Sequence, residues 1–132
     1  ALVDHRRPLA KRNFKAFERA AIDDPPNDPV IKTFKLFYNA GYEMIIFSGR
    51  SDDVWMQTMY WLRMNEIYPH HFRMRRGGDT RADHIVKKEF LDEIYPEGDY
   101  SDILCVFDDR NQVVDLWRSL NIPCFQVAPG DF

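Results

Sequence analysis

The sequence predicts an α/β fold in which a Rossmann-like parallel sheet lies between helices, a three-layer arrangement. The first observation is that short apolar runs alternate with segments whose apolar residues recur at helical spacing. The second is the run 103–107, which is apolar at every position, as is typical of a strand buried on both faces by covering helices. Parallel strands require crossover connections, which such helices supply, so the alternation favours a parallel sheet.

Local signals define the expected elements of the first half. Asp28 is a good N-cap residue, Pro29 suits a first helical position and Gly41 suits a left-handed stop, so a helix is expected between them. The apolar stripe of that helix is Val30, Ile31, Phe34, Phe37 and Tyr38. An earlier helix is expected over 11–22, a buried strand over 42–47, and a helix over 52–64 that Ser51 caps.

The second half continues the alternation. A short strand is expected around Phe72 and a helix over 83–94. The inward face of that helix is expected to comprise Ile85, Val86, Phe90 and Ile94. A strand over 102–107, a helix over 112–120 and a last strand over 124–127 complete the expected order.

Composition limits the class of protein. The 132 residues suit one domain, with an N-terminal, cap-like segment over 1–27 and a core over 28–132. The net charge of −3 excludes a global basic field, so contact with nucleic acid would need a local patch. Cys105 and Cys124 lie in apolar runs and look like buried free thiols, which indicates a reducing, cytoplasmic setting. No apolar run is long enough to span a membrane and no signal peptide is visible, so no membrane partner is expected.

Polar residues at the ends of two expected strands are candidate site residues. Asp108 and Asp109 follow a strand, and two adjacent carboxylates are well placed to hold Mg²⁺, which prefers oxygen ligands. The alternative is that one Asp caps the next helix while the other is solvated. Ser48 and the N–H groups after it could hold a phosphate, although a simple turn into the helix explains the same residues.

Basic residues lie between these two strands. The arginines Arg73, Arg75, Arg76 and Arg81 could pair with phosphate oxygens, and a solvated face is the alternative. On the helix expected over 83–94, either Lys87 or Lys88 could lie inward and neutralise a carboxylate or a phosphoryl oxygen.

Four segments together carry a resemblance to a known family. They are 42–50 (YEMIIFSGR), 78–81 (GDTR) with Val86-Lys87 soon after, 107–114 (FDDRNQVV) and the tail 126–132 (QVAPGDF). From about Asp28 to the end, the chain resembles the haloacid dehalogenase (HAD) superfamily of phosphohydrolases, and more closely the phosphatase domain of phage-type polynucleotide kinase. The resemblance implies a HAD-like fold and a role in DNA or RNA end repair.

The resemblance also implies a role for each matching residue. Ser48 would hydrogen-bond the transferring phosphoryl group with Arg50 beside it, and Lys87 would stabilise that group and a nucleophilic carboxylate. The implied substrate-binding residues are Gly49, Arg75 and Arg81, and the implied Mg²⁺ ligands, direct or through water, are Asp108 and Asp109. In such sites the cations neutralise charge that develops on the phosphoryl oxygens.

One departure concerns the nucleophile. The family's Asp-x-Asp-Gly-Thr motif, which supplies the nucleophile and the general acid/base, does not occur in this sequence. Asp4 could be the nucleophile of a degenerate motif, or 1–7 could follow the motif, in which case the first catalytic strand is absent. The second alternative is preferred, because only three apolar residues precede Asp4 and a buried strand needs about five.

The expected function is therefore that of a Mg²⁺-dependent phosphomonoester hydrolase of HAD type, similar to polynucleotide 3′-phosphatases, present here as a fragment or an inactive copy. One alternative is a non-catalytic module that binds phosphate or nucleic acid, and a second is a small-molecule nucleotidase. The expected partner is a phosphorylated substrate, either a nucleic-acid 3′ end or a nucleotide. A receiver-type signalling domain is discounted because its acidic pair comes early in the chain.

Overall fold

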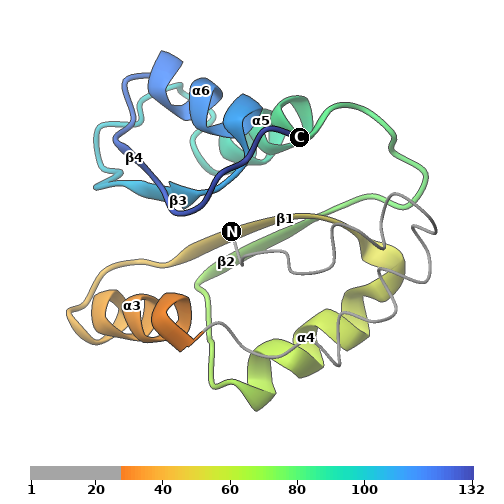
Figure 1. The fold of residues 1–132 in the computed structure, drawn as a ribbon, viewed down its shortest axis with the longest axis vertical. Coiled ribbons are helices and arrows are strands. Elements are labelled where there is room, and N and C mark those ends of the chain that lie inside the picture. Colours follow the sequence, from red (N-terminus) through yellow and green to blue (C-terminus); the bar gives the residue numbers. More distant parts are fainter. Residues whose placement is uncertain (1–27) are drawn as a thin grey trace. The chain divides into compact units, whose positions relative to one another are not determined.

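The computed structural model describes residues 28–132, and these fall into two compact units, 28–79 and 80–132. Each unit contains helices and a pair of parallel strands (Figure 1). The parallel α/β class is confirmed, and the strands pair as β1 with β2 and as β3 with β4. The predictions for 1–27, including the helix over 11–22 and the role of Asp4, lie outside the described residues.

The unit 28–79 begins with α3 (Asp28–Asn39) and continues through β1 (Ile45–Ser51), a 3₁₀ turn η2 (Asp52–Val54), α4 (Trp55–Met64) and β2 (His71–Arg75). Helix α3 ends as predicted, with Gly41 at a φ of +93°. Both helices pack against the same strand pair, because Ile31 of α3, Ile46 of β1 and Leu62 of α4 share one buried cluster. Ser51 caps η2 by accepting a hydrogen bond from the N–H of Asp53, as predicted for the helix start.

The strand predicted over 42–47 is displaced along the chain. It begins at Ile45 and continues to Ser51, so Ser48 lies within β1 and does not follow it. Residues Ile45 to Ser48 pair with His71 to Met74 in regular register, and the next pair is Ser51 with Arg75. Gly49 and Arg50 therefore bulge out of the ladder, which apolar periodicity cannot indicate.

The unit 80–132 contains α5 (Asp83–Ile94), β3 (Val106–Asp108), α6 (Asn111–Ser119) and β4 (Cys124–Gln126). In Figure 1 the two helices lie next to each other on one side of β3 and β4. Their buried apolar side chains form the core of this unit, with Ile122 from the following turn: Val86, Phe90, Leu91, Val113, Val114 and Trp117. The helix boundaries agree with the sequence prediction to within one residue.

Three predictions for this unit are wrong in part. The strand expected over 102–107 is shorter and later, since only Val106–Asp108 pairs with the three-residue β4, and Leu104 is 52% exposed. Ile85, expected to face inward, is 42% exposed, and the buried positions of α5 include Asp83 and Lys87. The two cysteines are free thiols, as predicted, but each is only partly buried.

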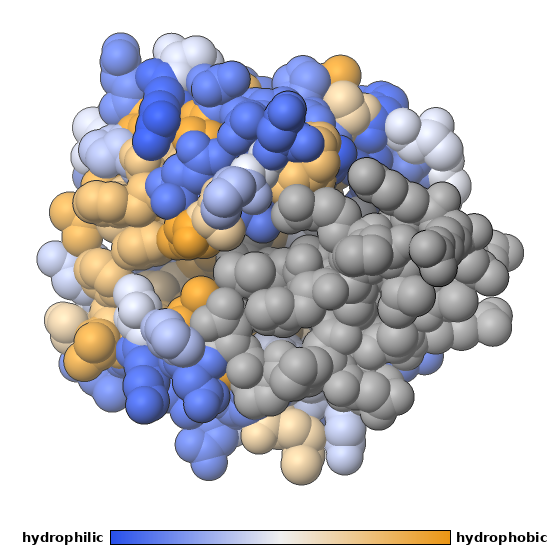
Figure 2. Space-filling model, in the orientation of Figure 1, coloured by the Kyte–Doolittle hydropathy of each residue, from blue (hydrophilic) through white to orange (hydrophobic). Residues whose placement is uncertain are grey.

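The surface carries scattered apolar side chains. On the face drawn in Figure 2, apolar areas interrupt the hydrophilic surface. Helix α4 exposes Met56, Tyr60 and Met64 at a spacing of one turn, with exposed fractions of 76%, 54% and 65%. None of the helices in residues 28–132 combines the length and the hydropathy that crossing a membrane requires.

Candidate functional site

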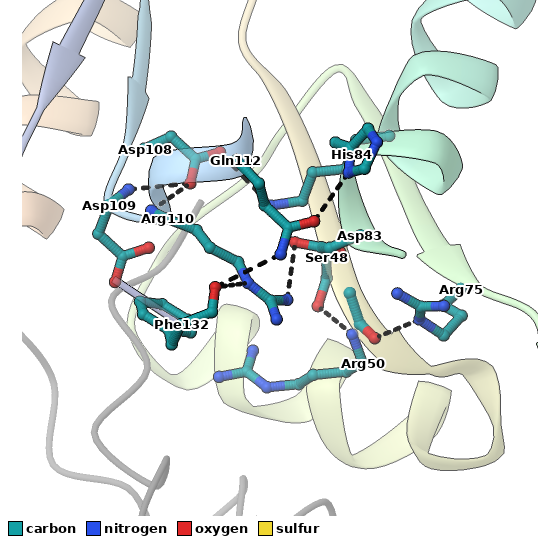
Figure 3. A network of polar contacts seen from close by, with 12 residues as sticks. Ser48, Arg50, Arg75, Asp83, His84, Asp108, Asp109, Arg110, Gln112 and Phe132 are labelled. Carbon is teal, nitrogen blue, oxygen red and sulfur yellow. Dashed lines mark hydrogen bonds and ion pairs between the residues drawn. The ribbon is translucent and has the colours of Figure 1, made fainter. Parts of the chain in front are cut away.

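A buried lysine and two buried carboxylates form a charged cluster in the unit 80–132. Figure 3 labels the two carboxylates, Asp83 and Asp108. Asp83 opens α5 and Lys87 lies one turn later, so both side chains are on the same face of the helix. The Lys87 Nζ lies 3.2 Å from Asp83 Oδ2 and 3.4 Å from Asp108 Oδ2. No side chain of the three is more than 7% exposed. One ammonium therefore neutralises two carboxylates away from water.

Asp108 accepts hydrogen bonds on both of its carboxylate oxygens. Its Oδ1 accepts from the backbone N–H of Asp109 at 2.9 Å and of Arg110 at 3.3 Å. Its Oδ2 accepts from Lys87 at 3.4 Å and from the Trp117 indole N–H at 3.5 Å. The side chain thus organises the turn after β3 and joins it to α5 and α6.

The pKa values of the two partners move in opposite directions. Burial by itself raises the pKa of Asp108, but the Lys87 ammonium and the donated hydrogen bonds outweigh it and place that pKa below its usual range. Burial lowers the pKa of Lys87, but the carboxylates of Asp108 and Asp83 outweigh it and raise that pKa above its usual range. Both groups are therefore charged at neutral pH. The interior of this unit thus keeps a cation beside residues 108–110, the turn after β3, which we call the acidic turn.

The two adjacent lysines of α5 have different environments. Lys87 is 4% exposed within the charged cluster. Lys88 lies on the partly exposed side of the helix, where its Nζ contacts Asp92 at 2.7 Å and the Tyr100 ring centroid at 5.9 Å. The structure thus resolves the alternative that the sequence left open, and Lys87 is the inward lysine.

The alternative in which one Asp of the pair caps the next helix and the other is solvated does not agree with the structure. The N-cap residue of α6 is Arg110, and its side chain makes no capping hydrogen bond within the described residues. Asp108 instead binds the two N–H groups that precede the helix. Asp109 is not solvated either, since it is 8% exposed and its backbone oxygen accepts a hydrogen bond from Gln126 at 3.0 Å.

The acidic pair has the chemistry of a hard-cation site. Two carboxylates at the end of a parallel strand are suitable oxygen donors for Mg²⁺. Within 28–132, however, no group of three or more His, Cys, Asp or Glu side chains is placed to hold a metal ion. Asp108 and Asp109 therefore fit a cation that completes its coordination with water or with further oxygen ligands, as Mg²⁺ commonly does.

The unit 28–79 holds the other predicted phosphate-binding residues at the bulge of β1. The hydroxyl oxygen of Ser48 accepts a hydrogen bond from the N–H of Arg50 at 3.2 Å, and both residues are half-buried (Figure 3). Its O–H remains a donor of the kind that binds phosphate oxygens. The bulge thus places a hydroxyl, the backbone of Gly49 and a guanidinium within three consecutive residues.

The arginines predicted to bind phosphate have different surroundings. Arg75 Nε donates to the Gly49 carbonyl at 3.0 Å and one terminal nitrogen donates to the Asp79 carbonyl at 3.1 Å, so its side chain is only 11% exposed. Arg75 therefore supports the bulge from β2. Arg81 lies in the other unit and forms an exposed, two-pronged ion pair with Glu89, with one contact of 2.8 Å. Substrate contact by either arginine stays a prediction.

The sequence reasoning missed several residues that surround the predicted ones. Asp83 could have been found, because a carboxylate four residues before an inward lysine shares its helix face. The roles of Arg110, Trp117 and Gly130 depend on contacts between segments far apart in the chain. Within the unit 80–132 the structure brings Lys87, Asp108 and Asp109 together, and within 28–79 it brings together Ser48, Gly49, Arg50 and Arg75.

Comparisons with known proteins were made with this geometry in hand. The family model described as "Polynucleotide kinase PNKP phosphatase domain" matches residues 4–132. A protein of Autographa californica nuclear polyhedrosis virus, named "Putative bifunctional polynucleotide kinase/RNA ligase", is 32% identical over 114 residues. That match covers 85% of this chain and 16% of the viral protein.

Two solved structures are also similar. A chain from the "Structure of the Pnkp1/Rnl/Hen1 RNA repair complex" is 42% identical with a TM-score of 0.79, and the match covers 87% of this chain and 37% of that chain. A chain from the "Structure of Pnkp1/Rnl/Hen1 complex" is 38% identical with a TM-score of 0.77, covering 86% of this chain and 39% of that one. This chain therefore spans well under half the length of each relative.

Proposed function

The chain belongs to the family of PNKP phosphatase domains, a HAD-type family, and from this premise we propose that it serves Mg²⁺-dependent hydrolysis of phosphate at nucleic-acid 3′ ends. The observation that carries the proposal is the buried Lys87, held between Asp83 and Asp108 beside the acidic turn. A fixed cation in a dry site stabilises charge that develops on phosphoryl oxygens far better than a solvated one does. A purely structural ion pair would not need a second carboxylate, Asp109, directly after it.

The two carboxylates have different roles in this proposal. Both oxygens of Asp108 already accept hydrogen bonds, so we assign Asp108 to holding Lys87 and the turn. Asp109, with Asp108 beside it, would hold Mg²⁺ directly or through water, and HAD-type domains generally use this ion. When bound, the ion supplies positive charge that polarises the phosphoryl group. Within the unit 28–79, the Ser48 hydroxyl and Arg50 are donors of the kind that bind phosphate oxygens.

The nucleophile is not among the groups that this sequence supplies by motif. No Asp-x-Asp pair occurs anywhere in the 132 residues. We therefore propose that these residues contribute the cation-binding and phosphoryl-stabilising part of the reaction, and that the covalent step needs an Asp-x-Asp motif from outside them. The same observation favours the second candidate, a module that binds phosphorylated nucleic acid without hydrolysing it.

The deciding experiment compares oligonucleotides phosphorylated at the 3′ or the 5′ end, with and without Mg²⁺, using the full-length protein that contains this chain. Release of phosphate from the 3′ end only, dependent on Mg²⁺ and abolished by Lys87→Gln but not by Lys88→Gln, supports the phosphatase. Binding of the 3′-phosphorylated strand without hydrolysis supports the module. Equal release from nucleoside monophosphates would favour a nucleotidase, and neither binding nor release would overturn both candidates.

A further inference from the structure

The segment 127–132 lies along the backbone of the acidic turn. The N–H of Val127 donates to the Asp108 carbonyl at 3.0 Å, and the Gly130 carbonyl accepts from the N–H of Asn111 at 2.8 Å. Between these contacts, the Gln126 side chain donates to the Asp109 carbonyl at 3.0 Å. Hydrogen bonds from Gln126 and from this segment thus reach the backbone of Asp108, Asp109 and Asn111.

Gly130 makes the closest of these approaches. A Cβ atom at this position would lie 1.6 Å from the backbone oxygen of Asp109 and 2.8 Å from the Cα of Arg110. Both neighbours are backbone atoms, which cannot rotate away as the end of a flexible side chain can. Glycine is therefore required here for packing, and the segment touches the acidic turn directly.

Arg110, at the end of the acidic turn, contacts Phe132, the last residue of the segment (Figure 3). The Arg110 Nε donates to the Phe132 carbonyl at 2.8 Å, and its guanidinium carbon lies 4.9 Å from the centroid of the Phe132 ring. Gln112 donates to the same carbonyl at 3.4 Å. An arginine that hydrogen-bonds a carbonyl and stacks on the adjacent ring is held in one orientation.

The other end of Arg110 reaches the charged cluster. One of its terminal nitrogens lies 3.7 Å from Asp83 Oδ2, the same oxygen that lies 3.2 Å from the Lys87 ammonium. Arg110 and Lys87 therefore share one carboxylate oxygen. A change in the orientation of Arg110 would therefore change the surroundings of the carboxylate that Lys87 contacts.

We propose that residues 127–132 form a strap, closed by Arg110 on Phe132, that positions Lys87 and the acidic turn for binding Mg²⁺ and phosphate. This inference rests on the proposed function and adds a control element to the same site. Arg110 is a positioning residue, since it acts through Asp83 and through the backbone of the turn. A residue that does not bind the metal ion itself but orients the residues that do typically contributes about 10- to 100-fold to metal affinity.

The test measures Mg²⁺ binding directly by calorimetry on the full-length protein that contains this chain, together with the kinetic constants of that protein for 3′-phosphate hydrolysis. We expect Arg110→Gln to weaken Mg²⁺ binding about 10- to 100-fold. Arg110→Lys keeps a positive charge near Asp83 but lacks the planar guanidinium group with its several N–H donors. It should therefore retain only part of the Mg²⁺ affinity of the unmodified protein. Arg118→Gln is the matched control, because Arg118, in the last turn of α6, also donates to a backbone carbonyl, that of Cys124 at 3.0 Å, away from the acidic turn.

A second variant protects the test against misfolding. Phe132→Leu leaves the backbone carbonyl and removes only the ring that stacks on Arg110, so it should fold and lose a smaller share of Mg²⁺ affinity. If Arg110→Gln folds and its Mg²⁺ affinity is unchanged, the strap is overturned and the proposed function stays intact. If Arg110→Gln does not fold, unchanged Mg²⁺ affinity in Phe132→Leu has the same meaning. Absence of Mg²⁺ binding by the unmodified protein overturns the proposed function together with the strap.

Discussion

The acidic turn of the unit 80–132 and the β1 bulge of the unit 28–79 supply the same kind of chemistry by different means. Around Asp108 the polar groups are side chains that are nearly inaccessible to water and paired with one another. At Ser48 the groups are half-buried and held mainly by backbone contacts. Removing one member of a buried pair leaves an uncompensated charge, whereas a half-exposed group can be rehydrated. Variants of the acidic turn should therefore change stability and function together, and variants of the bulge should change function with a smaller loss of stability.

The largest expected effect is that of Lys87→Gln. This change leaves Asp83 and Asp108 buried without their shared cation, which should lower the free energy of unfolding by about 3–5 kcal/mol. Urea unfolding measures the loss. Lys88→Gln, next to it on the exposed side, should change stability by less than about 0.5 kcal/mol. Equal losses in the two variants would contradict the contrast between the regions.

The next effect tests the support of the bulge. Arg75→Gln removes the donors to the carbonyls of Gly49 and Asp79, which should cost about 1–3 kcal/mol because both acceptors are partly buried. Arg81→Gln breaks only the exposed pair with Glu89 and should cost less than about 1 kcal/mol. Hydrogen exchange at the amides of β1 should increase in the first variant alone. Protection that is unchanged there would show that the bulge does not need Arg75.

Acid should destabilise the acidic turn more than the bulge. The folded pKa of Asp108 lies below its unfolded value of about 4, so this carboxylate adds stability above pH 4 and loses it as the pH falls through the folded pKa. Lys87 has a raised pKa, and its contribution is lost only in alkali. Unfolding followed from pH 6 down to pH 2 should show a flatter pH dependence in Asp108→Asn than in the unmodified chain. Parallel curves would mean that Asp108 is not held ionised by its partners.

Among the changes within the two regions themselves, the smallest expected effect on stability is that of Ser48→Ala. This change removes an acceptor for the Arg50 N–H at a half-buried position, at a cost of about 0.5–1.5 kcal/mol. Phosphate affinity, measured by titration with inorganic phosphate, should fall at the same time because a donor is lost. Thr at this position keeps the hydroxyl and is the matched control. Unchanged phosphate affinity in Ser48→Ala would remove the bulge from the proposed function.

Local patterns determined much of this protein. The helix over 83–94 was predicted to the residue, because amphipathic periodicity is a property of neighbouring residues. Gly41 and Ser51 were predicted to end and to cap helices for the same reason, and the structure agrees. Asp108 and Asp109 were also identified from the sequence as an acidic pair after a strand, whereas Lys87 was distinguished from Lys88 only by the family resemblance.

Only the tertiary structure decided how these residues are used. Lys87 and Asp108 are 21 residues apart, and Arg110 and Phe132 are 22 residues apart, so no local pattern records either contact. The bulge at Gly49 depends on the register with β2, and the need for glycine at 130 depends on how closely the strap approaches Asp109. Ion pairs, registers and close approaches depend on distances between distant segments, and these distances exist only once the core has packed.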